Sequence, residues 1–370
     1  MAGEIRALTG LRGVAAVSVV VYHFVQYVPV PASSLHTLAM RGYLAVDVFF
    51  VLSGFVMALT YGRMFAGGFV AAAYREFLLR RVARIVPLYL VALGLVMADR
   101  ARVGFTMPGD GNPVVLILAN FLLVQSWGIA PSLIAASWSV STEIAAYLVF
   151  PVVLQVTLFR SRRHAGDGVL IATLLLVGAA AGGRLLALPG NGALDLSDGT
   201  SLLPLMRCLG GFILGLVAFR AAQSPRVMAI VGHDRFAVAV FLLFLSGLWY
   251  GMPDLTRYPL LPLIVLVAYA NRGLPTRLLA CPPVHWLGEC SYAIYLLHGE
   301  VLHVSGRLLH VLAGSSTQGI GRVIAAMFIG IFVLSLAGAA HRWIEVPARR
   351  VLRNPRVVLA AALGVAVQKP

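Results

Sequence analysis

The chain alternates long apolar runs with short polar connections. A transmembrane α-helix needs about 20 mostly apolar residues, because each residue rises about 1.5 Å and the hydrocarbon core is about 30 Å thick. Ten runs approach this length, and some of them are short; they lie at residues 7–28, 43–60, 85–98, 138–159, 169–188, 202–219, 236–252, 258–270, 290–313 and 320–342. The pattern predicts an all-α, polytopic integral membrane protein with about ten transmembrane helices.

The distribution of arginine orients these helices. An eleventh apolar run, Val114–Trp127, has only 14 residues, and we expect it to be a re-entrant or half helix. With that assignment and a cytoplasmic N-terminus, the inner loops and tail hold 19 Arg and Lys residues and the outer loops hold 5. Cytoplasmic loops are enriched in positive charge, so this bias predicts that both termini are cytoplasmic. If the eleventh run crossed, the bias would reverse.

The same pattern predicts the domain organisation. Residues 1–350 are expected to form one membrane domain, and residues 351–370 a basic cytoplasmic tail. The longest polar connection contains Phe69–Leu79, which is typical of an interfacial helix with arginine on its polar side. Any catalytic site is therefore expected inside the helical bundle or at its two faces.

Composition restricts the class of protein further. Apolar residues make up 60% of the 370 residues and charged residues 12%, against roughly 45–50% and 25% in soluble domains. A soluble enzyme and a disordered chain are thereby excluded. The net charge of +15 comes mainly from arginines between apolar runs, which favours a membrane surface over nucleic acid. The three cysteines show neither metal-ligand nor disulfide spacing, and we expect no metal.

Ionisable residues within apolar runs are functional candidates, because charge at membrane depth is costly. Arg12 and His23 are 11 residues apart, which places them about 20° from the same helix face and about 16 Å apart along the axis. An imidazole that titrates near neutral pH is a suitable proton acceptor for a hydroxyl. The alternative is a core histidine bonded to a neighbouring helix.

A carboxylate is expected at a similar depth to His23. Asp47 lies about one turn inside the outer end of the second apolar run, within Val46–Phe55. There it would orient and polarise the imidazole of His23, as an acid does in hydrolase triads. The alternative is a structural His–Asp or Arg–Asp pair. In the same stretch, Gly54 and Ser53 would allow close helix approach.

A cluster of arginines marks the expected cytoplasmic mouth of the third run. Guanidinium groups suit phosphates, which makes this cluster a candidate binding site for a phosphate-bearing co-substrate. The alternative is ordinary membrane topology, which also places arginine at this position. The cluster consists of Arg75, Arg80, Arg81 and Arg84.

Four further residues are candidates for the site or its surroundings. Glu143 follows a run of serines and is expected in the outer half of the membrane, where a carboxylate would bind a sugar or hold the histidine. Capping would explain the serines but not Glu143. His298 lies on one helix face with Tyr295, and we assign it with Tyr292 to the co-substrate site. For Tyr292 the alternative is an interfacial anchor. Glu345, near the end of the last run, would pair with the arginines.

Six short motifs occur in one order over nearly the whole chain. They are Arg12 with His23, Val46–Phe55, Arg80–Tyr89, Trp138–Glu143 with Tyr147 and Pro151, Leu287–His298, and Glu345 with Pro347. Together they resemble the integral-membrane acyltransferase family 3. The departure is Ala145-Ala146, where relatives usually carry larger residues, and it concerns the shape of the acceptor.

The resemblance implies transfer of an acyl group, often acetyl, from acyl-CoA to a hydroxyl of a polysaccharide, peptidoglycan, lipid-linked sugar or secondary metabolite. It also implies His23 as the catalytic residue, with Arg12 and the Arg81 and Arg84 pair as partners. We therefore expect a multi-pass O-acyltransferase of the bacterial cytoplasmic membrane. In it, acyl-CoA enters from the cytoplasm and the acceptor from outside, near Glu143. The alternative is a polytopic transporter or flippase of a glycan or lipid, because buried charges also mark transport pathways.

Overall fold

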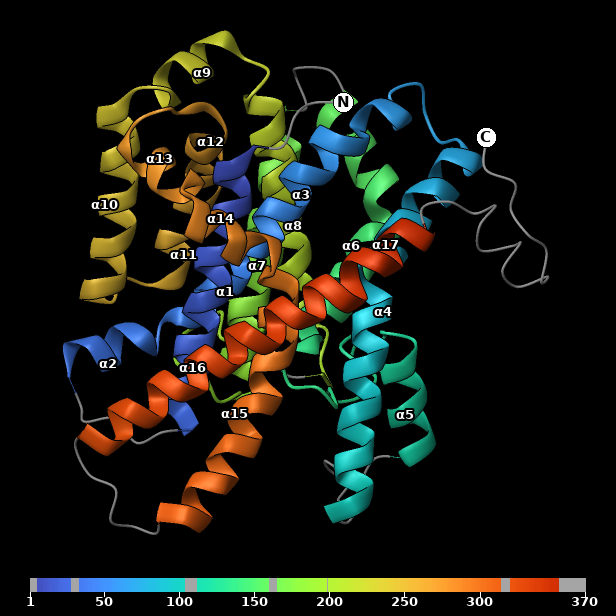
Figure 1. Cartoon of the computed structure of the whole chain (residues 1–370). Helices are drawn as coiled ribbons and strands as arrows, with labels where there is room; N and C mark the ends of the chain where they lie inside the picture. The colour runs from blue at the N-terminus through green and yellow to red at the C-terminus, as the bar shows by residue number, and fades with distance from the viewer. Residues whose placement is uncertain are drawn as a thin grey trace, which may run out of the picture.

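The computed structural model describes residues 5–27, 33–103, 112–159, 165–197, 199–313 and 320–352. Every regular element in these ranges is a helix, as Figure 1 shows, so the prediction of an all-α protein is confirmed for them. The predicted tail at residues 351–370 lies almost wholly outside the described residues, which end at Leu352.

The helices follow one another with short connections. The first half contains α1 (Arg6–Tyr27), α2 (Ser34–Ala39), η1 (Gly42–Leu44), α3 (Ala45–Tyr61), η2 (Gly62–Phe65), α4 (Ala71–Val103), α5 (Pro113–Phe121), α6 (Ser137–Leu154), η3 (Gln155–Phe159) and α7 (Ala165–Leu185). The second half contains α8 (Leu203–Ala221), α9 (Pro225–Val231), α10 (Asp234–Tyr250), α11 (Asp254–Arg257), α12 (Leu260–Ala270), α13 (Leu274–Ala280), α14 (Pro282–Glu289), α15 (Ser291–Ala313), α16 (Ile320–Ala340), η6 (His341–Glu345) and α17 (Val346–Leu352).

Several of these helices suit a membrane. Within the described residues, seven helices are long and apolar enough to cross a membrane, or up to eight if the bent pair α9 and α10 forms one span. Large apolar side chains such as Leu95, Leu174 and Phe328 are more than 60% exposed, as expected for a surface that faces lipid. A multi-pass membrane protein is consistent with both observations. The count of ten spans and the cytoplasmic termini stay predictions.

Two short helices explain why the number of spans is difficult to predict. The run at 258–270 forms α12, whose 11 residues extend about 17 Å and do not reach across a hydrocarbon core of about 30 Å. Helix α5 has 9 residues, about 14 Å, and is also too short to cross. That length agrees with the half helix expected within Val114–Trp127.

Helix α4 corrects one prediction. It is continuous over 33 residues, so the separate interfacial helix expected at Phe69–Leu79 is wrong. From Ala71 onward those residues form the first turns of α4, which extends about 50 Å. The arginines of this stretch therefore lie on the same rigid helix as the apolar residues that follow. Pro87 lies inside α4 without ending it.

Glycine contacts set the central packing. Helix α3 packs against α8 so closely that a Cβ atom at Gly54 would lie 2.0 Å from the carbonyl oxygen of Phe212 and 3.2 Å from Cα of Gly215. The prediction that Gly54 allows close helix approach is confirmed. Helix α1 is held in the same way, because a Cβ atom at Gly13 would lie 2.6 Å from the backbone nitrogen of Gly288 in α14.

Helix α1 lies at the centre of several helix contacts. It packs against α3, α13, α14 and α15, and it runs from the upper to the lower end of the bundle in Figure 1. Helix α16 crosses obliquely in front of it, packs on α15 and leads to α17 beside α4. Arg12 and His23 are both half-buried in this surround.

Candidate functional site

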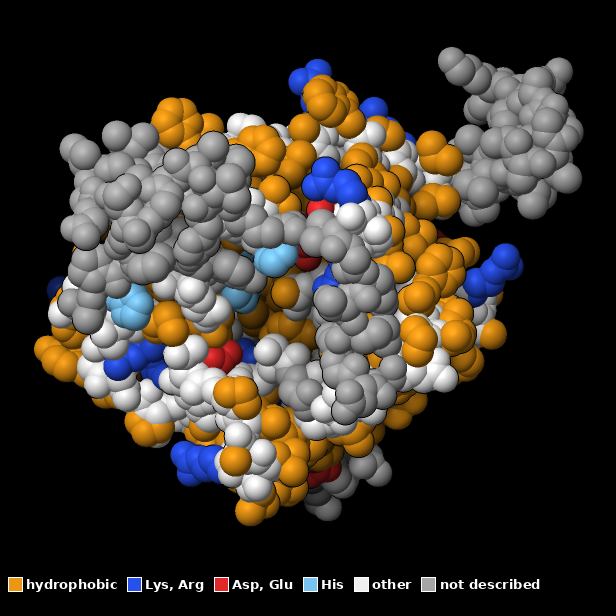
Figure 2. All heavy atoms as spheres, turned by 90° about the horizontal axis from the view of Figure 1, so that it is seen from below, with side chains coloured by type: hydrophobic (Ala, Val, Ile, Leu, Met, Phe, Trp, Pro, Cys, Tyr) orange, Lys and Arg blue, Asp and Glu red, His pale blue; other side chains and the backbone are white. Residues whose placement is uncertain are grey.

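His23 forms a pair with a second histidine from a distant part of the chain. Nδ1 of His23 lies 3.0 Å from Nε2 of His298, and the two ring centroids are 5.0 Å apart. His23 lies in the lower half of α1, and the fully buried His298 lies two turns into α15. Figure 2 shows the lower end of the molecule, where histidine side chains lie beside a recess near the middle of the face.

The surroundings of the pair fix which nitrogens carry protons. Nδ1 of His298 lies 2.7 Å from the carbonyl oxygen of Tyr295 and 3.2 Å from that of Ile294. Carbonyl oxygens only accept, so a neutral His298 carries its proton on Nδ1 and presents Nε2 as an acceptor. Nδ1 of His23 then faces two acceptors, Nε2 of His298 and the carbonyl oxygen of Val19 at 3.1 Å, and donates to them.

This arrangement leaves Nε2 of His23 as the unprotonated nitrogen of a neutral ring. Nε2 has no hydrogen-bond partner among the described residues. The arrangement of His23 is therefore that of a general base whose free lone pair points away from its orienting partner. The sequence placed His298 in the co-substrate site, whereas the structure places it against His23.

Asp47 does not contact His23. Both of its carboxylate oxygens accept from Arg207, with Nε to Oδ1 at 2.9 Å and Nη2 to Oδ2 at 2.7 Å. The hydroxyl of Tyr258 donates to Oδ1 at 3.0 Å, and the carboxylate is fully buried. The expected orientation of His23 by Asp47 is corrected by these contacts, and the alternative of a structural Arg–Asp pair describes them.

The role of Arg207 as the partner of Asp47 was not predicted from the sequence, where Arg207 lies inside the apolar run 202–219. It is 1% exposed and also donates to the backbone carbonyls of Tyr43 and Leu196. The signal that would have found it is the same one that found His23, since a charged residue within an apolar run needs a buried partner. The pair joins α3 to α8 beside the glycine contact.

A cluster of arginines occupies the opposite end of α1. Arg84 on α4 interacts with Arg12, Arg81 and Arg349, and among these the largest interaction is with Arg12. Neither Arg12 nor Arg84 has a hydrogen bond or ion pair closer than 4 Å among the described residues. Arg12 and Arg84, close to each other and without a hydrogen-bonded anion among the described residues, form an environment suited to a phosphate. We call Arg12, Arg81, Arg84 and Arg349 the arginine cluster.

The four arginines predicted for the co-substrate do not lie together. Arg81 is buried and donates from Nη2 to the hydroxyl of Tyr61 at 2.6 Å, while its Nε has no partner. Arg80 is partly exposed and forms an ion pair with Glu76 one turn earlier. Arg75 is exposed. The structure therefore brings Arg81 and Arg84 into the interior with Arg12, and it leaves Arg75 and Arg80 on the surface of α4.

Glu143 belongs to the neighbourhood of the arginine cluster. Its Oε1 accepts from Ser53 at 2.5 Å and from Tyr147 at 2.6 Å, and the carboxylate interacts electrostatically with Arg12. It has no contact with His23 among the described residues. The expectation that Glu143 lies beside the histidine is therefore not met. Its charge compensates Arg12 instead.

Two further predicted residues have structural contacts. The hydroxyl of Tyr292 donates to the backbone carbonyl of Ile85 at 2.8 Å, which ties α15 to α4. Glu345 pairs with Arg349 at 2.7 Å, one turn later in the chain, and among the described residues it forms no ion pair with the four arginines of α4 for which it was expected. Its other oxygen, Oε1, is buried without a hydrogen-bond partner.

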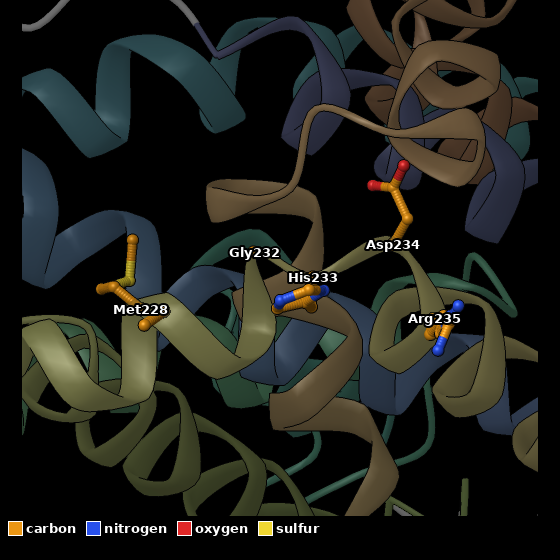
Figure 3. A pocket seen from close by; sticks show the side chains of 6 residues that line it. Met228, Gly232, His233, Asp234 and Arg235 are labelled. Atoms are coloured by element: carbon orange, nitrogen blue, oxygen red, sulfur yellow. The ribbon is translucent and has the colours of Figure 1, made fainter.

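A separate cavity of about 550 Å³ lies at the break between α9 and α10, shown in Figure 3. There Asp234 points away from His233 toward another helix, where its Oδ1 accepts from Asn271 at 2.9 Å. None of the predicted site residues lines this cavity. Within the described residues, no group of three or more His, Cys, Asp and Glu side chains is placed to hold a metal.

Comparisons with known proteins agree with the motifs. A family model described as an acyltransferase domain matches residues 5–341. Acyltransferase MdmB of Streptomyces mycarofaciens is 30% identical, over 96% of this chain and 94% of that protein. The putative peptidoglycan O-acetyltransferase YrhL of Bacillus subtilis is 25% identical over 81% of this chain, and O-acetyltransferase OatA of Staphylococcus aureus is 23% identical over 93%. The matches cover only 49% and 57% of those two proteins. No solved structure matches the chain.

Proposed function

This chain belongs to acyltransferase family 3 and is an acyltransferase, and we propose that it transfers an acyl group such as acetyl from acyl-CoA to a hydroxyl. The acceptor is a glycan, a lipid-linked sugar or a secondary metabolite. The observation that carries this proposal is the histidine pair, because it leaves Nε2 of His23 free to accept a proton. The family match favours this enzyme over the alternative of a transporter or flippase.

The donor is assigned to the arginine cluster. The nucleotide end of acyl-CoA carries phosphates, and Arg12 and Arg84 have no bonded anion among the residues that the structure describes. Arg12 and His23 lie about 16 Å apart along α1, which is about the reach of a pantetheine arm. If the phosphates of acyl-CoA bind at the arginine cluster, the thioester at the other end of the donor would lie at His23. Arg75 and Arg80 would serve only at the rim, where they attract the donor from the cytoplasm.

The reaction follows as a direct transfer. Nε2 of His23 takes the proton from the acceptor hydroxyl as its oxygen attacks the thioester carbonyl. The new C–O bond forms, the C–S bond breaks, and the departing thiolate takes the proton back from the imidazolium. The products are an O-acyl ester and free coenzyme A, and His23 returns to its starting form. His298 acts as a positioning residue, because it holds the proton of His23 on Nδ1.

The topology follows from the same assignment. The arginine cluster would face the cytoplasm, where acyl-CoA is made, and the recess beside the histidines would face the outside of the bacterial cytoplasmic membrane. The helix α1 then carries the donor's phosphate site at one end and the base toward the other. The acyl group crosses most of the membrane while bound to the donor, and only the acceptor is met from the outer side.

The test compares cells that carry the wild-type gene, no gene, or a variant. Mass spectrometry of glycans, lipids and metabolites identifies a molecule that gains one acyl mass only when the gene is present. His23→Ala is expected to lower that product roughly 10²–10⁴-fold with normal amounts of protein in the membrane. His36→Ala, a histidine of α2 outside the site, is the matched control and should acylate normally. Full acylation by His23→Ala would refute the assignment of His23.

A further inference from the structure

A second polar site lies next to His23, on the connection between α7 and α8. A cavity of about 380 Å³ is lined by Arg184 at the end of α7 and by Asn191 and Asp195 in the connection. This volume falls within the range of small-molecule pockets, roughly 300–1,000 Å³. None of these residues belongs to the histidine pair or to the arginine cluster.

The cavity is joined to the base through one side chain. Tyr22 precedes His23 in α1, its ring packs edge-on against the imidazole at 4.9 Å between centroids, and its hydroxyl donates to Oδ2 of Asp195 at 2.9 Å. Nδ2 of Asn191 lies 3.1 Å from the same hydroxyl. The carboxylate of Asp195 also interacts electrostatically with His23. A molecule in the cavity would therefore lie one side chain away from the catalytic nitrogen.

The connection between α7 and α8 is fixed to neighbouring elements by hydrogen bonds and close packing. The backbone nitrogen of Leu194 donates to Oδ2 of Asp254 at 2.8 Å, and Asp254 in turn accepts from Tyr43 and Arg257. A Cβ atom at Gly192 would lie 1.9 Å from the hydroxyl of Tyr43, so this close approach requires glycine. The polar groups of the cavity are thus presented from a fixed backbone.

The unused bonding capacity of the cavity indicates its ligand. Oδ2 of Asp195 accepts from Tyr22 and Asn191, whereas Oδ1 accepts no hydrogen bond from the described residues. Arg184 offers donors and Asp195 offers an acceptor. The amide nitrogen of Asn191 already donates to Tyr22 and Asp195, so Asn191 offers its carbonyl oxygen as an acceptor. Neighbouring hydroxyls, each of which donates and accepts, match this set. An anionic ligand is disfavoured by the Asp195 carboxylate, which has no ion pair there.

We propose that the cavity formed by Arg184, Asn191 and Asp195 binds a vicinal diol of the acceptor, an uncharged sugar ring, and holds it beside Tyr22 so that a further hydroxyl of the acceptor reaches Nε2 of His23. This inference rests on the proposed function for its link to acyl transfer. The binding site itself makes a separate claim, because a sugar would occupy it without any acyl donor. The substrate class named is therefore a glycoside with adjacent free hydroxyls.

The experiment measures sugar binding directly. Full-length protein in nanodiscs, without donor, is titrated with a panel of methyl hexopyranosides and observed by saturation-transfer difference NMR. Binding of at least one glycoside is expected, and Asp195→Asn is expected to weaken it about tenfold or more, because a hydrogen bond to a charged group is lost. The deoxy analogue that lacks the matching hydroxyl should lose a similar factor against wild type and little against Asp195→Asn.

The controls separate binding from folding. Asp167→Asn changes a carboxylate at the other end of α7 and should bind glycosides as wild type does. Asn191→Ala removes an exposed side chain and leaves the bond between Tyr22 and Asp195 in place. It is also expected to weaken glycoside binding, and it therefore serves as the test variant if Asp195→Asn does not fold. The proposal is overturned if no glycoside binds, or if the folded variants bind as tightly as wild type.

The same sample distinguishes this inference from the proposed function. Consumption of acetyl-CoA is followed on the wild-type protein with membrane extract as the source of acceptor. Glycoside binding without thioester consumption would leave the cavity standing and refute the proposed donor. Thioester consumption without glycoside binding would leave the acyl transfer standing and refute the cavity as the acceptor site.

Discussion

Nε2 of His298 accepts a hydrogen bond from Nδ1 of His23 over 3.0 Å, although 275 residues separate the two histidines. Without this acceptor, only the carbonyl oxygen of Val19 would hold the proton of His23 on Nδ1. His298→Phe is therefore expected to lower kcat roughly 10–100-fold and to leave KM for acyl-CoA unchanged, because the fraction of His23 in the productive form and orientation falls. The measurement is steady-state kinetics with the acceptor identified by mass spectrometry.

A spectroscopic readout tests whether His298 acts through His23. In ¹⁵N-histidine spectra, wild-type His23 should show a protonated Nδ1 and an unprotonated Nε2, and His298→Phe should show both tautomers. His298→Gln keeps a side-chain acceptor and should recover part of kcat. If His298→Phe loses activity while the tautomer of His23 stays as in wild type, the positioning role assigned to His298 is wrong.

Removing one guanidinium from the arginine cluster should weaken binding of the donor without lowering the stability of the protein. Arg84→Met is expected to raise KM for acetyl-CoA roughly 10–100-fold, because charge-assisted hydrogen bonds to phosphate are lost. The thermal midpoint should not fall, since repulsion from Arg12 and Arg81 is relieved. S-acetylpantetheine lacks the nucleotide phosphates and should give equal KM values for both proteins. Arg63→Met, at an exposed arginine within η2, is the matched control. Unchanged KM for acetyl-CoA would place the phosphates elsewhere.

The pair of Asp47 and Arg207 predicts a strong thermodynamic coupling. Arg207→Leu leaves a fully buried carboxylate without its partner and is expected to cost about 3–5 kcal/mol of stability. Asp47→Leu leaves the guanidinium of Arg207 without its partner and is expected to cost a similar amount of stability. The double substitution removes both charges and should recover most of the loss, as measured by thermal unfolding in detergent micelles. Additive losses in the double variant would show that the two side chains are not coupled.

Helix contacts through glycine give a prediction on packing alone. Gly54→Ala would bring a methyl group within 2.0 Å of a backbone oxygen in α8 and is expected to cost about 1–3 kcal/mol. Gly94→Ala in α4 has no atom within 4 Å of the new methyl group and should be neutral or slightly stabilising. The comparison uses thermal midpoints of the two variants. A smaller loss for Gly54→Ala than for Gly94→Ala would contradict the close packing of α3 on α8.

The parts of the candidate site that a sequence can specify are those within a single helix. Helical periodicity places Arg12 and His23 on one face of α1, and the short spacing of Arg81 and Arg84 keeps both near the same end of α4. The position of Gly54 at a helix contact follows from its place in an apolar run. These relationships depend on local geometry, which the sequence specifies directly.

The relationships that sequence reasoning missed connect helices far apart in the chain. Asp47 and His23 were paired because the predicted spans put them at one depth, but depth does not determine which way each side chain points. Arg207 comes 160 residues later and takes the carboxylate, and His298 takes the imidazole. Nothing in a single sequence states which helix is a neighbour of α1, so the contact of α15 with α1 was not accessible.

The buried pair of Asp47 and Arg207 also has a consequence for biosynthesis. During synthesis, Asp47 precedes Arg207 by 160 residues, so the carboxylate in α3 has no partner until α8 has been made. A chain that stops after α7 has no partner for this carboxylate and cannot close its packing around α3. Truncation at that point is therefore expected to give a rapidly degraded fragment, and addition of α8 should be the step at which the nascent protein becomes resistant to proteases.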